Sequence, residues 1–192
     1  MVETTGALLA PDECASVVKW AEAQAKADGG WATTRHYEAP TTDIEVQRIA
    51  RILPWFNRLL EVDIFPLLAS RFPALAPDGA KWLRVNDAFV VRYDAAGGQV
   101  GLPPHRDESA LSMTIALSDV ADYEGGGTRM MESGDGGAYE DLVFRLRQGF
   151  AVAHPGMLPH QGVPITKGVR YVLALFVVSE EPSFDNPGDE LL

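Results

Sequence analysis

The hydrophobic pattern of the sequence changes near Lys81, and this change constrains the fold more than any other feature. Before Lys81, apolar residues recur at helical spacing. After it, short runs rich in β-branched and aromatic residues alternate with clusters of Gly, Pro and Asp. We expect strands within residues 82–94, 110–118, 127–131, 142–146, 149–154 and 169–179. Helices followed by many short strands predict an α+β protein, with a jelly-roll (double-stranded β-helix, cupin-like) sandwich and the N-terminal helices packed on one sheet.

The part before Lys81 is predicted to contain three helices. Residues 11–28 form the first, because they carry one apolar stripe and are followed by two glycines. Asp43 is predicted to cap a short second helix that ends at Leu53. A third helix is expected over residues 54–71, bent at Pro66. The apolar stripes of these helices indicate packing against the sheet.

The chain of 192 residues is expected to form a single domain, because this length can bury one substantial core. We divide it into a helical support over about residues 1–80, a jelly-roll core over 81–179 and a frayed tail over 180–192. Residues 132–141 are polar, acidic and rich in glycine. We interpret them as a mobile loop between strands, with a lid as the second interpretation.

Three residues in the strand-rich part form a candidate metal site. In His105-x-Asp107 the imidazole and the carboxylate stand two residues apart, which places both on the same face of an extended strand. A second histidine, His160, follows at the edge of another apolar run. Two histidines and one carboxylate are the ligand set of non-haem Fe(II) oxygenases, in which the remaining coordination positions serve substrate and oxygen.

Arg170 follows His160 in a run that is predicted to be a buried strand. A buried guanidinium needs an anionic partner. The distal carboxylate of a 2-oxoglutarate molecule bound to the metal would supply one, and it suits the planar fork of arginine better than the ammonium of lysine. An internal salt bridge is the alternative. Lys167 could compete for this role, but its turn context predicts a solvated side chain.

Further motifs accompany these residues in a fixed order: Pro40-Thr41-Thr42-Asp43-Ile44, Phe89-Val90-Val91-Arg92-Tyr93, Pro104-His105-Arg106-Asp107, Asp122-Tyr123-Glu124-Gly125-Gly126-Gly127, His154-Pro155-Gly156 and Gly168-Val169-Arg170-Tyr171. The ordered set resembles the 2-oxoglutarate/Fe(II)-dependent dioxygenases of the prolyl 4-hydroxylase-like superfamily, and in particular the catalytic domain of procollagen-lysine (lysyl) hydroxylases. The resemblance extends from about Pro40 to Val178.

The resemblance implies an oxidoreductase that needs Fe(II), 2-oxoglutarate as cosubstrate and O₂, with ascorbate as a supporting reductant. It also implies that His105, Asp107 and His160 bind the iron and that Arg170 grips 2-oxoglutarate. The implied reaction hydroxylates an unactivated C–H bond and releases succinate and CO₂.

Other residues near these motifs have two interpretations each. Tyr93 and Thr114 are assigned to the cosubstrate pocket, with core packing as the alternative for Tyr93 and Ser112 as an equivalent candidate to Thr114. His154 is interpreted as a structural residue rather than a ligand. His36 is interpreted either as a surface histidine or as part of a substrate cleft.

The three glycines that follow Glu124 have the look of a phosphate-binding loop, but no Lys-Ser/Thr pair and no helix pattern follow them. They are expected to form a tight turn or to allow a close backbone approach.

Composition and charge restrict the classes of substrate and partner further. A net charge of −11 disfavours a nucleic-acid substrate, because such binding depends on Lys and Arg. It favours cationic substrates, with a role in solubility alone as the alternative. No apolar run reaches the length of a membrane span. The first residues lack a signal-peptide pattern, and the single cysteine, Cys14, is expected to be a buried thiol. We therefore predict a cytoplasmic protein with no membrane partner, while the sequence leaves the oligomeric state undetermined.

The predicted substrate is an amino-acid side chain, with lysine in a protein or peptide favoured by the resemblance. Four acidic residues are candidates to pair with the lysine ammonium, with ordinary surface solvation as the alternative for each: Asp43, Asp87, Asp94 and Glu108. A prolyl hydroxylase and a hydroxylase of a free amino acid or another small molecule are alternatives. A metal- or 2-oxoglutarate-binding sensor module without turnover is the alternative from another functional class.

Overall fold

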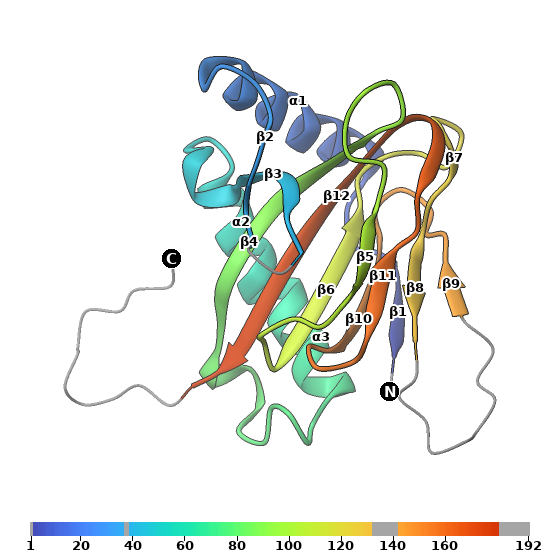
Figure 1. Cartoon of the computed structure of the whole chain (residues 1–192). Coiled ribbons are helices and arrows are strands. Elements are labelled where there is room, and N and C mark those ends of the chain that lie inside the picture. The colour runs from blue at the N-terminus through green and yellow to red at the C-terminus, as the bar shows by residue number, and fades with distance from the viewer. Residues whose placement is uncertain (1, 37–38, 132–141, 181–192) are drawn as a thin grey trace.

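The computed structural model describes residues 2–36, 39–131 and 142–180. Two antiparallel β-sheets face each other, and helices cover the outer face of the larger sheet (Figure 1). This architecture confirms the predicted α+β jelly-roll sandwich with N-terminal helices on one sheet. The predicted loop at 132–141 and residues 181–192 of the predicted tail lie outside the described residues.

The larger sheet has eight strands, and its path runs β1-β10-β6-β12-β4-β3-β2, with β7 paired to the start of β12. In β4 and β12, near the middle of this sheet, Val169 lies opposite Asp94 at one end and Ser179 opposite Leu83 at the other. The strands comprise β1 (Glu3–Ala7), β2 (Ala32–Arg35), β3 (Thr41–Glu45), β4 (Leu83–Asp94), β6 (Leu111–Ala116), β7 (Tyr123–Gly125), β10 (Phe150–Pro155) and β12 (Ile165–Ser179).

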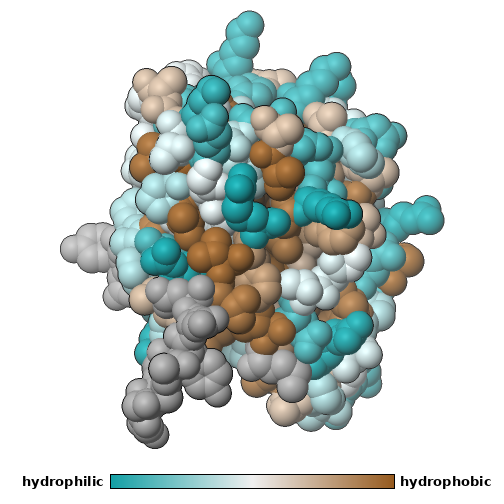
Figure 2. All heavy atoms as spheres, turned by 90° about the vertical axis from the view of Figure 1, so that its right-hand side faces the viewer, coloured by the Kyte–Doolittle hydropathy of each residue, from teal (hydrophilic) through white to brown (hydrophobic). Residues whose placement is uncertain are grey.

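The smaller sheet has four short strands in the order β5-β11-β8-β9. They are β5 (Leu102–His105), β11 (His160–Gly162), β8 (Thr128–Met130) and β9 (Leu142–Phe144). Among the described residues no helix lies over its outer face (Figure 1). Leu142 and Val143 of β9 are exposed, as is Met157 in the turn before β11. Figure 2 shows apolar side chains gathered on the side of the molecule where the smaller sheet lies.

The helical layer holds most of the hydrophobic core. It comprises α1 (Pro11–Ala27), the 3₁₀ turns η1 (Val46–Arg48) and η3 (Gly79–Trp82), and the continuous segment α2 (Leu53–Leu59), π-helix η2 (Leu60–Ile64) and α3 (Phe65–Arg71). Helix residues such as Val17 and Phe56 are fully buried against sheet residues such as Val90 and Leu173. Their neighbours Val91 and Val172 belong to a second apolar cluster, because alternate side chains of a strand point to opposite faces.

The first helix agrees with its prediction. It spans Pro11–Ala27, and the side chain of Glu13 accepts a hydrogen bond from the Ala10 N–H at its start. Gly29 and Gly30, with φ of 90° and 129°, end it in the left-handed region that glycine adopts most readily.

The predicted second helix is wrong. Residues Thr41–Glu45 form strand β3, in which Asp43 lies opposite Val91 of β4, and only the 3₁₀ turn η1 follows. The side chain of Asp43 therefore caps no helix; it pairs with Arg35 instead. The β-branched residues of β3 favour an extended chain, and pairing with β4 supplies hydrogen bonds that a short helix gains only after a costly nucleation step.

The third helix is present, but near the expected bend it changes from an α-helix to a π-helix and back. Pro66 lies in the first turn of α3, directly after the π-helical segment η2. Proline lacks an N–H and its ring clashes with the preceding turn. A local π-helix accommodates that clash and lets the helical segment continue to Arg71.

Candidate metal centre and active site

A cavity of about 370 Å³ lies between the two sheets. This volume is in the range of small-molecule binding sites. One wall comes from strands of the larger sheet and includes Phe89, Tyr93, Thr114, Val172, Arg170 and Phe176. The facing wall comes from the smaller sheet and the segment after β5, and it includes Leu102, His105, Asp107 and His160.

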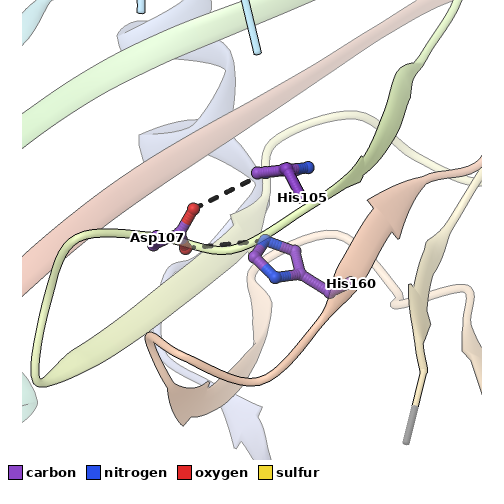
Figure 3. Close-up of side chains that lie close together, drawn as sticks. All are labelled: His105, Asp107 and His160. Carbon is purple, nitrogen blue, oxygen red and sulfur yellow. Dashed lines mark ion pairs between the residues drawn. The ribbon is translucent and has the colours of Figure 1, made fainter. Parts of the chain in front are cut away.

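His105, Asp107 and His160 converge in this cavity (Figure 3). His105 ends β5, His160 begins β11, and the two residues lie opposite each other in the sheet register. Asp107 lies beyond the end of β5, so only His105 of the expected strand pair is within a strand; the backbone N–H of Asp107 donates to the Gly156 carbonyl at 2.9 Å. Nε2 of His105 and Nε2 of His160 each lie 3.5 Å from an oxygen of Asp107.

These three side chains fit a divalent metal ion. Their ligand atoms lie within 4.8 Å of one another, so one ion can contact all three after small side-chain movements. Nδ1 of His105 lies 2.8 Å from the Pro103 carbonyl, and Nδ1 of His160 lies 3.0 Å from the Leu158 carbonyl. A carbonyl accepts only from a protonated Nδ1, so in neutral imidazoles both Nε2 lone pairs face the centre of the triad.

The charges at the triad also favour a cation. Asp107 is buried, and among the described residues its only ion-pair contacts are the two histidines. Burial lowers the pKa of His160, with His105 acting in the same direction and Asp107 opposing both. A neutral His160 leaves the buried carboxylate without a full counter-charge, and a buried charge needs a partner or a metal. Two neutral histidines and one carboxylate are the donor set of non-haem Fe(II) sites.

His154 packs against the His160 ring and is not one of the three clustered ligands, which fits its interpretation as a structural residue. Its ring lies 4.4 Å from the ring of His160, and its Nε2 is buried with no hydrogen-bond partner. Burial, with the adjacent His160, lowers the pKa of His154 to about 4. Gly156 follows in the same turn, where a Cβ atom would lie 2.3 Å from the Ser109 carbonyl oxygen. The His154-Pro155-Gly156 motif thus brings β10 close to the loop that carries Asp107.

Arg170 lines the same cavity and is 5% exposed. Among the described residues no carboxylate lies within ion-pair distance of it, so the alternative of an internal salt bridge finds no support there. Its guanidinium carbon lies 5.3 Å from the centre of the Tyr93 ring and 6.0 Å from that of Tyr123. Lys167 is instead a surface residue that pairs with Glu124 at 3.1 Å.

Tyr93, Thr114 and Ser112 all line the cavity. Tyr93 lies opposite Arg170 in the pairing of β4 with β12. Burial raises the pKa of Tyr93, while Arg170 acts in the opposite direction. The phenol is therefore protonated near neutral pH and can donate a hydrogen bond. Cα pairing places Thr114 opposite Ala174, and Ser112 opposite Phe176, on the neighbouring strand.

The glycine motif after Glu124 forms a tight turn against the chain before β12. Gly125, Gly126 and Gly127 all have positive φ, and a Cβ atom on Gly125 would lie 2.7 Å from the Pro164 carbonyl oxygen. The expected close backbone approach is therefore present.

The four candidate acids divide into two groups. Asp94 pairs with Arg92 at 2.8 Å and lies outside the cavity lining, so it has no place in a substrate site. Glu108 is exposed, lines the cavity and forms no ion pair within the described part of the chain. Asp87 lines the cavity too, and both it and the buried Asp43 pair with Arg35.

Sequence reasoning missed several residues of this region, and three of them bear on the charge and the aromatic character of the cavity. Phe89 and Phe176 line the cavity, and Arg35 joins Asp87 to Asp43 at its edge. His36, which follows Arg35, also lines the cavity and so belongs to the cleft rather than to the free surface. Side chains alternate in direction along β4 and β12, and this alternation could have predicted that the two phenylalanines lie on one face of the sheet. No pattern in the sequence pointed to Arg35.

Comparison with known proteins gives two kinds of relatives. The chain is 33% identical over 161 residues to the multifunctional procollagen lysine hydroxylase and glycosyltransferase LH3 of Homo sapiens, covering 78% of this chain and 20% of that protein. It is 38% identical over 141 residues to the procollagen-lysine,2-oxoglutarate 5-dioxygenase 1 of Rattus norvegicus, covering 72% and 18%. The chain thus spans about a fifth of the length of the curated relatives it matches. No family model matches it.

Solved structures share the fold at lower identity. The α-ketoglutarate-dependent epimerase SnoN from nogalamycin biosynthesis has a TM-score of 0.66 at 16% identity, with 100% of this chain and 85% of that chain covered. A Pseudomonas putida prolyl-4-hydroxylase has a TM-score of 0.60 at 14% identity, covering 94% and 93%. Together with the curated relatives they confirm the resemblance drawn from the sequence motifs. Within the described residues, none of the helices combines the length and the apolar character that crossing a bilayer requires.

Proposed function

We propose that this chain, a homologue of the procollagen-lysine hydroxylases with the fold of the 2-oxoglutarate/Fe(II)-dependent oxygenases, is a hydroxylase of an amino-acid side chain, with a lysyl side chain in a protein or peptide as substrate. One observation carries the proposal. A metal-type triad and a buried arginine without a carboxylate partner among the described residues line one cavity of suitable size.

When bound, Fe(II) and 2-oxoglutarate supply the oxidising chemistry, in which 2-oxoglutarate, O₂ and a C–H bond become succinate, CO₂ and a hydroxylated product. The residues of the chain prepare that chemistry. His105 and His160 present Nε2 because backbone carbonyls hold their Nδ1 protons. Asp107 adds a negative charge that favours binding of a divalent cation at the triad.

Arg170 is suited to orient the cosubstrate. Its guanidinium can form two parallel hydrogen bonds to the distal carboxylate of 2-oxoglutarate. The protonated phenol of Tyr93, which lies across from it in the sheet, can donate a third. Thr114, which also lines the cavity, is a further candidate donor. A fixed orientation of the cosubstrate contributes to catalysis, because the reacting atoms are then held in place before the reaction begins.

Apolar residues between these polar groups limit the entry of water. Val91, Val172 and Ala174 line the cavity wall between the Arg170 and Phe176 positions. Exclusion of water strengthens the electrostatic contacts of Arg170 and Asp107 with their ligands and protects reactive groups from side reactions.

A lysyl substrate is supported by charge as well as by the relatives. Glu108 and Asp87 both line the cavity, and the whole chain carries a net charge of −11. An acidic field attracts a cationic side chain and disfavours polyanions. The names of the curated relatives state lysine hydroxylation for those proteins, and the present proposal extends it to this chain.

The test is mass spectrometry of peptides after incubation with the purified chain, Fe(II), ascorbate, 2-oxoglutarate and air. Matched peptides that differ only in one lysine, proline or norleucine separate the substrate classes. The proposal predicts a gain of one oxygen on lysine, absent with His105→Ala. Oxygen on proline would replace the lysyl assignment with the prolyl one. Binding of 2-oxoglutarate without any succinate would support the sensor module instead.

A further inference from the structure

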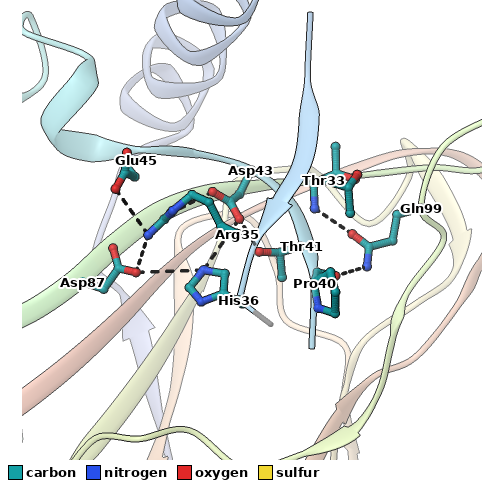
Figure 4. A network of polar contacts seen from close by, with 10 residues as sticks. Thr33, Arg35, His36, Pro40, Thr41, Asp43, Glu45, Asp87 and Gln99 are labelled. Atoms are coloured by element: carbon teal, nitrogen blue, oxygen red, sulfur yellow. Dashed lines mark hydrogen bonds and ion pairs between the residues drawn. The ribbon is translucent and has the colours of Figure 1, made fainter. Parts of the chain in front are cut away.

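A network of charged groups lies at one edge of the cavity, where β2, β3 and β4 meet (Figure 4). Arg35 is at its centre. Its Nη1 donates to Oδ1 of Asp43 at 2.8 Å, its Nη2 donates to Oδ2 of Asp87 at 2.5 Å, and Glu45 lies 3.4 Å away. One guanidinium thus faces three carboxylates, and the network carries a surplus of negative charge.

Aromatic rings line the cavity beside this network. The His36 ring lies 4.6 Å from the Phe89 ring and 5.9 Å from the Phe176 ring, and the two phenylalanine rings are 5.3 Å apart in an edge-to-face arrangement. The guanidinium carbon of Arg35 lies 5.2 Å from the centre of the Phe89 ring. The guanidinium of Arg35 therefore contacts the face of the Phe89 ring. Aromatic faces attract cations, so this wall of the cavity favours positively charged groups.

The network lies at the end of the cavity that is remote from Arg170. In the pairing of β4 with β12, Tyr93 lies opposite Arg170, whereas Asp87 lies opposite Phe176. The Arg170 and Phe176 positions lie six residues apart along an extended strand, which is roughly 20 Å. One end of the cavity is therefore cationic and suited to 2-oxoglutarate, and the other end is aromatic and acidic.

Two polar groups at the acidic end have unused bonding capacity. Oδ2 of Asp87 accepts a hydrogen bond from Arg35. Oδ1 of Asp87 makes no hydrogen bond or ion pair within the described part of the chain, and the side chain is 19% exposed. Nε2 of His36 is buried without a hydrogen-bond partner, 3.7 Å from Asp43 and 3.9 Å from Asp87. His36 also has φ of 59°, a conformation that non-glycine residues rarely adopt.

We propose that Asp87, with the aromatic wall of Phe89 and Phe176, binds the cationic end of the substrate side chain, and that Arg35 is the positioning residue that holds Asp87 toward the cavity. This inference rests on the proposed function and adds the residues that select the substrate. Asp43 and Glu45 complete the counter-charge of Arg35, so Asp87 keeps one carboxylate oxygen for the ligand.

The competing explanation is a purely structural network that ties edge strand β2 to the sheet. Both explanations predict that loss of Arg35 lowers the free energy of unfolding. Only the substrate-binding explanation predicts a change in the preference for a charged ligand over a neutral ligand of the same shape.

The test compares two probes, N-acetyl-lysine N-methylamide and its norleucine counterpart, which lacks the ammonium. Binding to the chain loaded with Mn(II) and 2-oxoglutarate under nitrogen is measured by equilibrium dialysis, so no turnover is needed. We expect the lysine probe to bind about tenfold more tightly than the norleucine probe, the size of effect typical of one charge-assisted hydrogen bond. In Asp87→Asn we expect the two affinities to agree within about twofold.

Three further variants keep the test independent of folding. Asp94→Asn removes a carboxylate from the same strand, outside the cavity, and should retain the full lysine preference. Arg35→Gln should lose most of the preference, and Arg35→Lys should restore part of it, with thermal melting reported for each variant. A structural role alone would change melting without changing the ratio of the two affinities.

Equal affinities of the two probes in the unaltered chain, absence of binding by either, or a full lysine preference in Asp87→Asn would overturn the inference. Its failure is distinguishable from failure of the proposed function. Succinate formation measured on the same preparations reports the oxygenase chemistry, and the binding ratio reports the subsite.

Discussion

Arg170 and Tyr93 lie opposite each other on β12 and β4, and the guanidinium carbon is 5.3 Å from the centre of the tyrosine ring. The aromatic face stabilises the cation without neutralising it, because a ring quadrupole is a much weaker partner than a carboxylate. Arg170 therefore keeps its full positive charge in a buried place, ready for an anionic ligand.

The first prediction concerns this charge. Arg170→Ala should raise the Kd for 2-oxoglutarate by roughly 10- to 100-fold, since a hydrogen bond to a charged group contributes about 1.5–3 kcal/mol. Metal binding should be retained, because the triad is untouched. Isothermal titration with Mn(II)-loaded protein measures both. Lys167→Ala, which removes an exposed cation paired with Glu124, is the matched control and should leave the Kd unchanged.

The second prediction concerns the metal. Saturating Mn(II), an oxygen-stable substitute for Fe(II), should raise the Tm of the unaltered chain by about 5–10 °C at a concentration near 100 times its Kd. A chelator should reverse the rise. His105→Ala should show no rise, while His36→Ala, which removes a cavity histidine outside the triad, should keep it. An equal rise in His105→Ala would show that the metal binds elsewhere.

The third prediction concerns acid stability. The pKa of His154 is lowered to about 4 by burial and by His160, below its value of 6.5 in an unfolded chain. As the pH falls, the unfolded chain therefore takes up a proton at this histidine before the folded chain does. This contribution to the free energy of unfolding keeps its full value above pH 6.5 and decreases as the pH falls toward 4. The loss should be on the order of 2–3 kcal/mol in metal-free protein.

Urea unfolding of metal-free protein at several pH values between 7 and 4 measures this loss. His154→Phe, which keeps an aromatic ring and removes the titration, should have a flatter profile than the unaltered chain. Parallel profiles for the two proteins would contradict the assignment of this acid sensitivity to His154.

The fourth prediction concerns the packing of the N-terminal segment on the sheet. Gly149 has φ of 81°, and a Cβ atom there would lie 2.0 Å from the Leu9 carbonyl oxygen. Gly149→Ala should lower the free energy of unfolding by about 2 kcal/mol or more, through backbone strain and overpacking. Gly97→Ala is the control, because a Cβ atom there meets nothing within 4 Å. Equal melting of the two variants would contradict the close contact.

Local sequence was sufficient for the parts of the fold that depend on nearest neighbours. The helix Pro11–Ala27 has its own start and stop signals. Strand β12 contains a long apolar run over residues 172–178, and β4 is rich in β-branched and aromatic residues toward its end. The metal triad was also predictable, because His105 and Asp107 stand two residues apart in sequence and His160 follows in a recognisable order. The structure then brought the three together.

Parts that depend on distant pairing were not predictable. Pairing with β4 is what made residues Thr41–Glu45 a strand rather than part of a helix. The three-residue strands β7 and β11 likewise depend on their partner strands. The Arg35–Asp87 ion pair joins residues of two strands that do not pair directly with each other. The acidic end of the cavity was therefore foreseen as separate acids, without the guanidinium and the rings that organise them.

The central claim is that this cavity converts 2-oxoglutarate through a metal held by His105, Asp107 and His160. The most direct measurement is succinate formed by the purified chain with Fe(II), ascorbate, 2-oxoglutarate and air, in the presence of a lysine-containing peptide. We predict succinate above background in the unaltered chain and in Asp94→Asn, and none above background in His105→Ala. Succinate formed equally by His105→Ala, or absent from metal-loaded unaltered chain that binds 2-oxoglutarate, would contradict the claim.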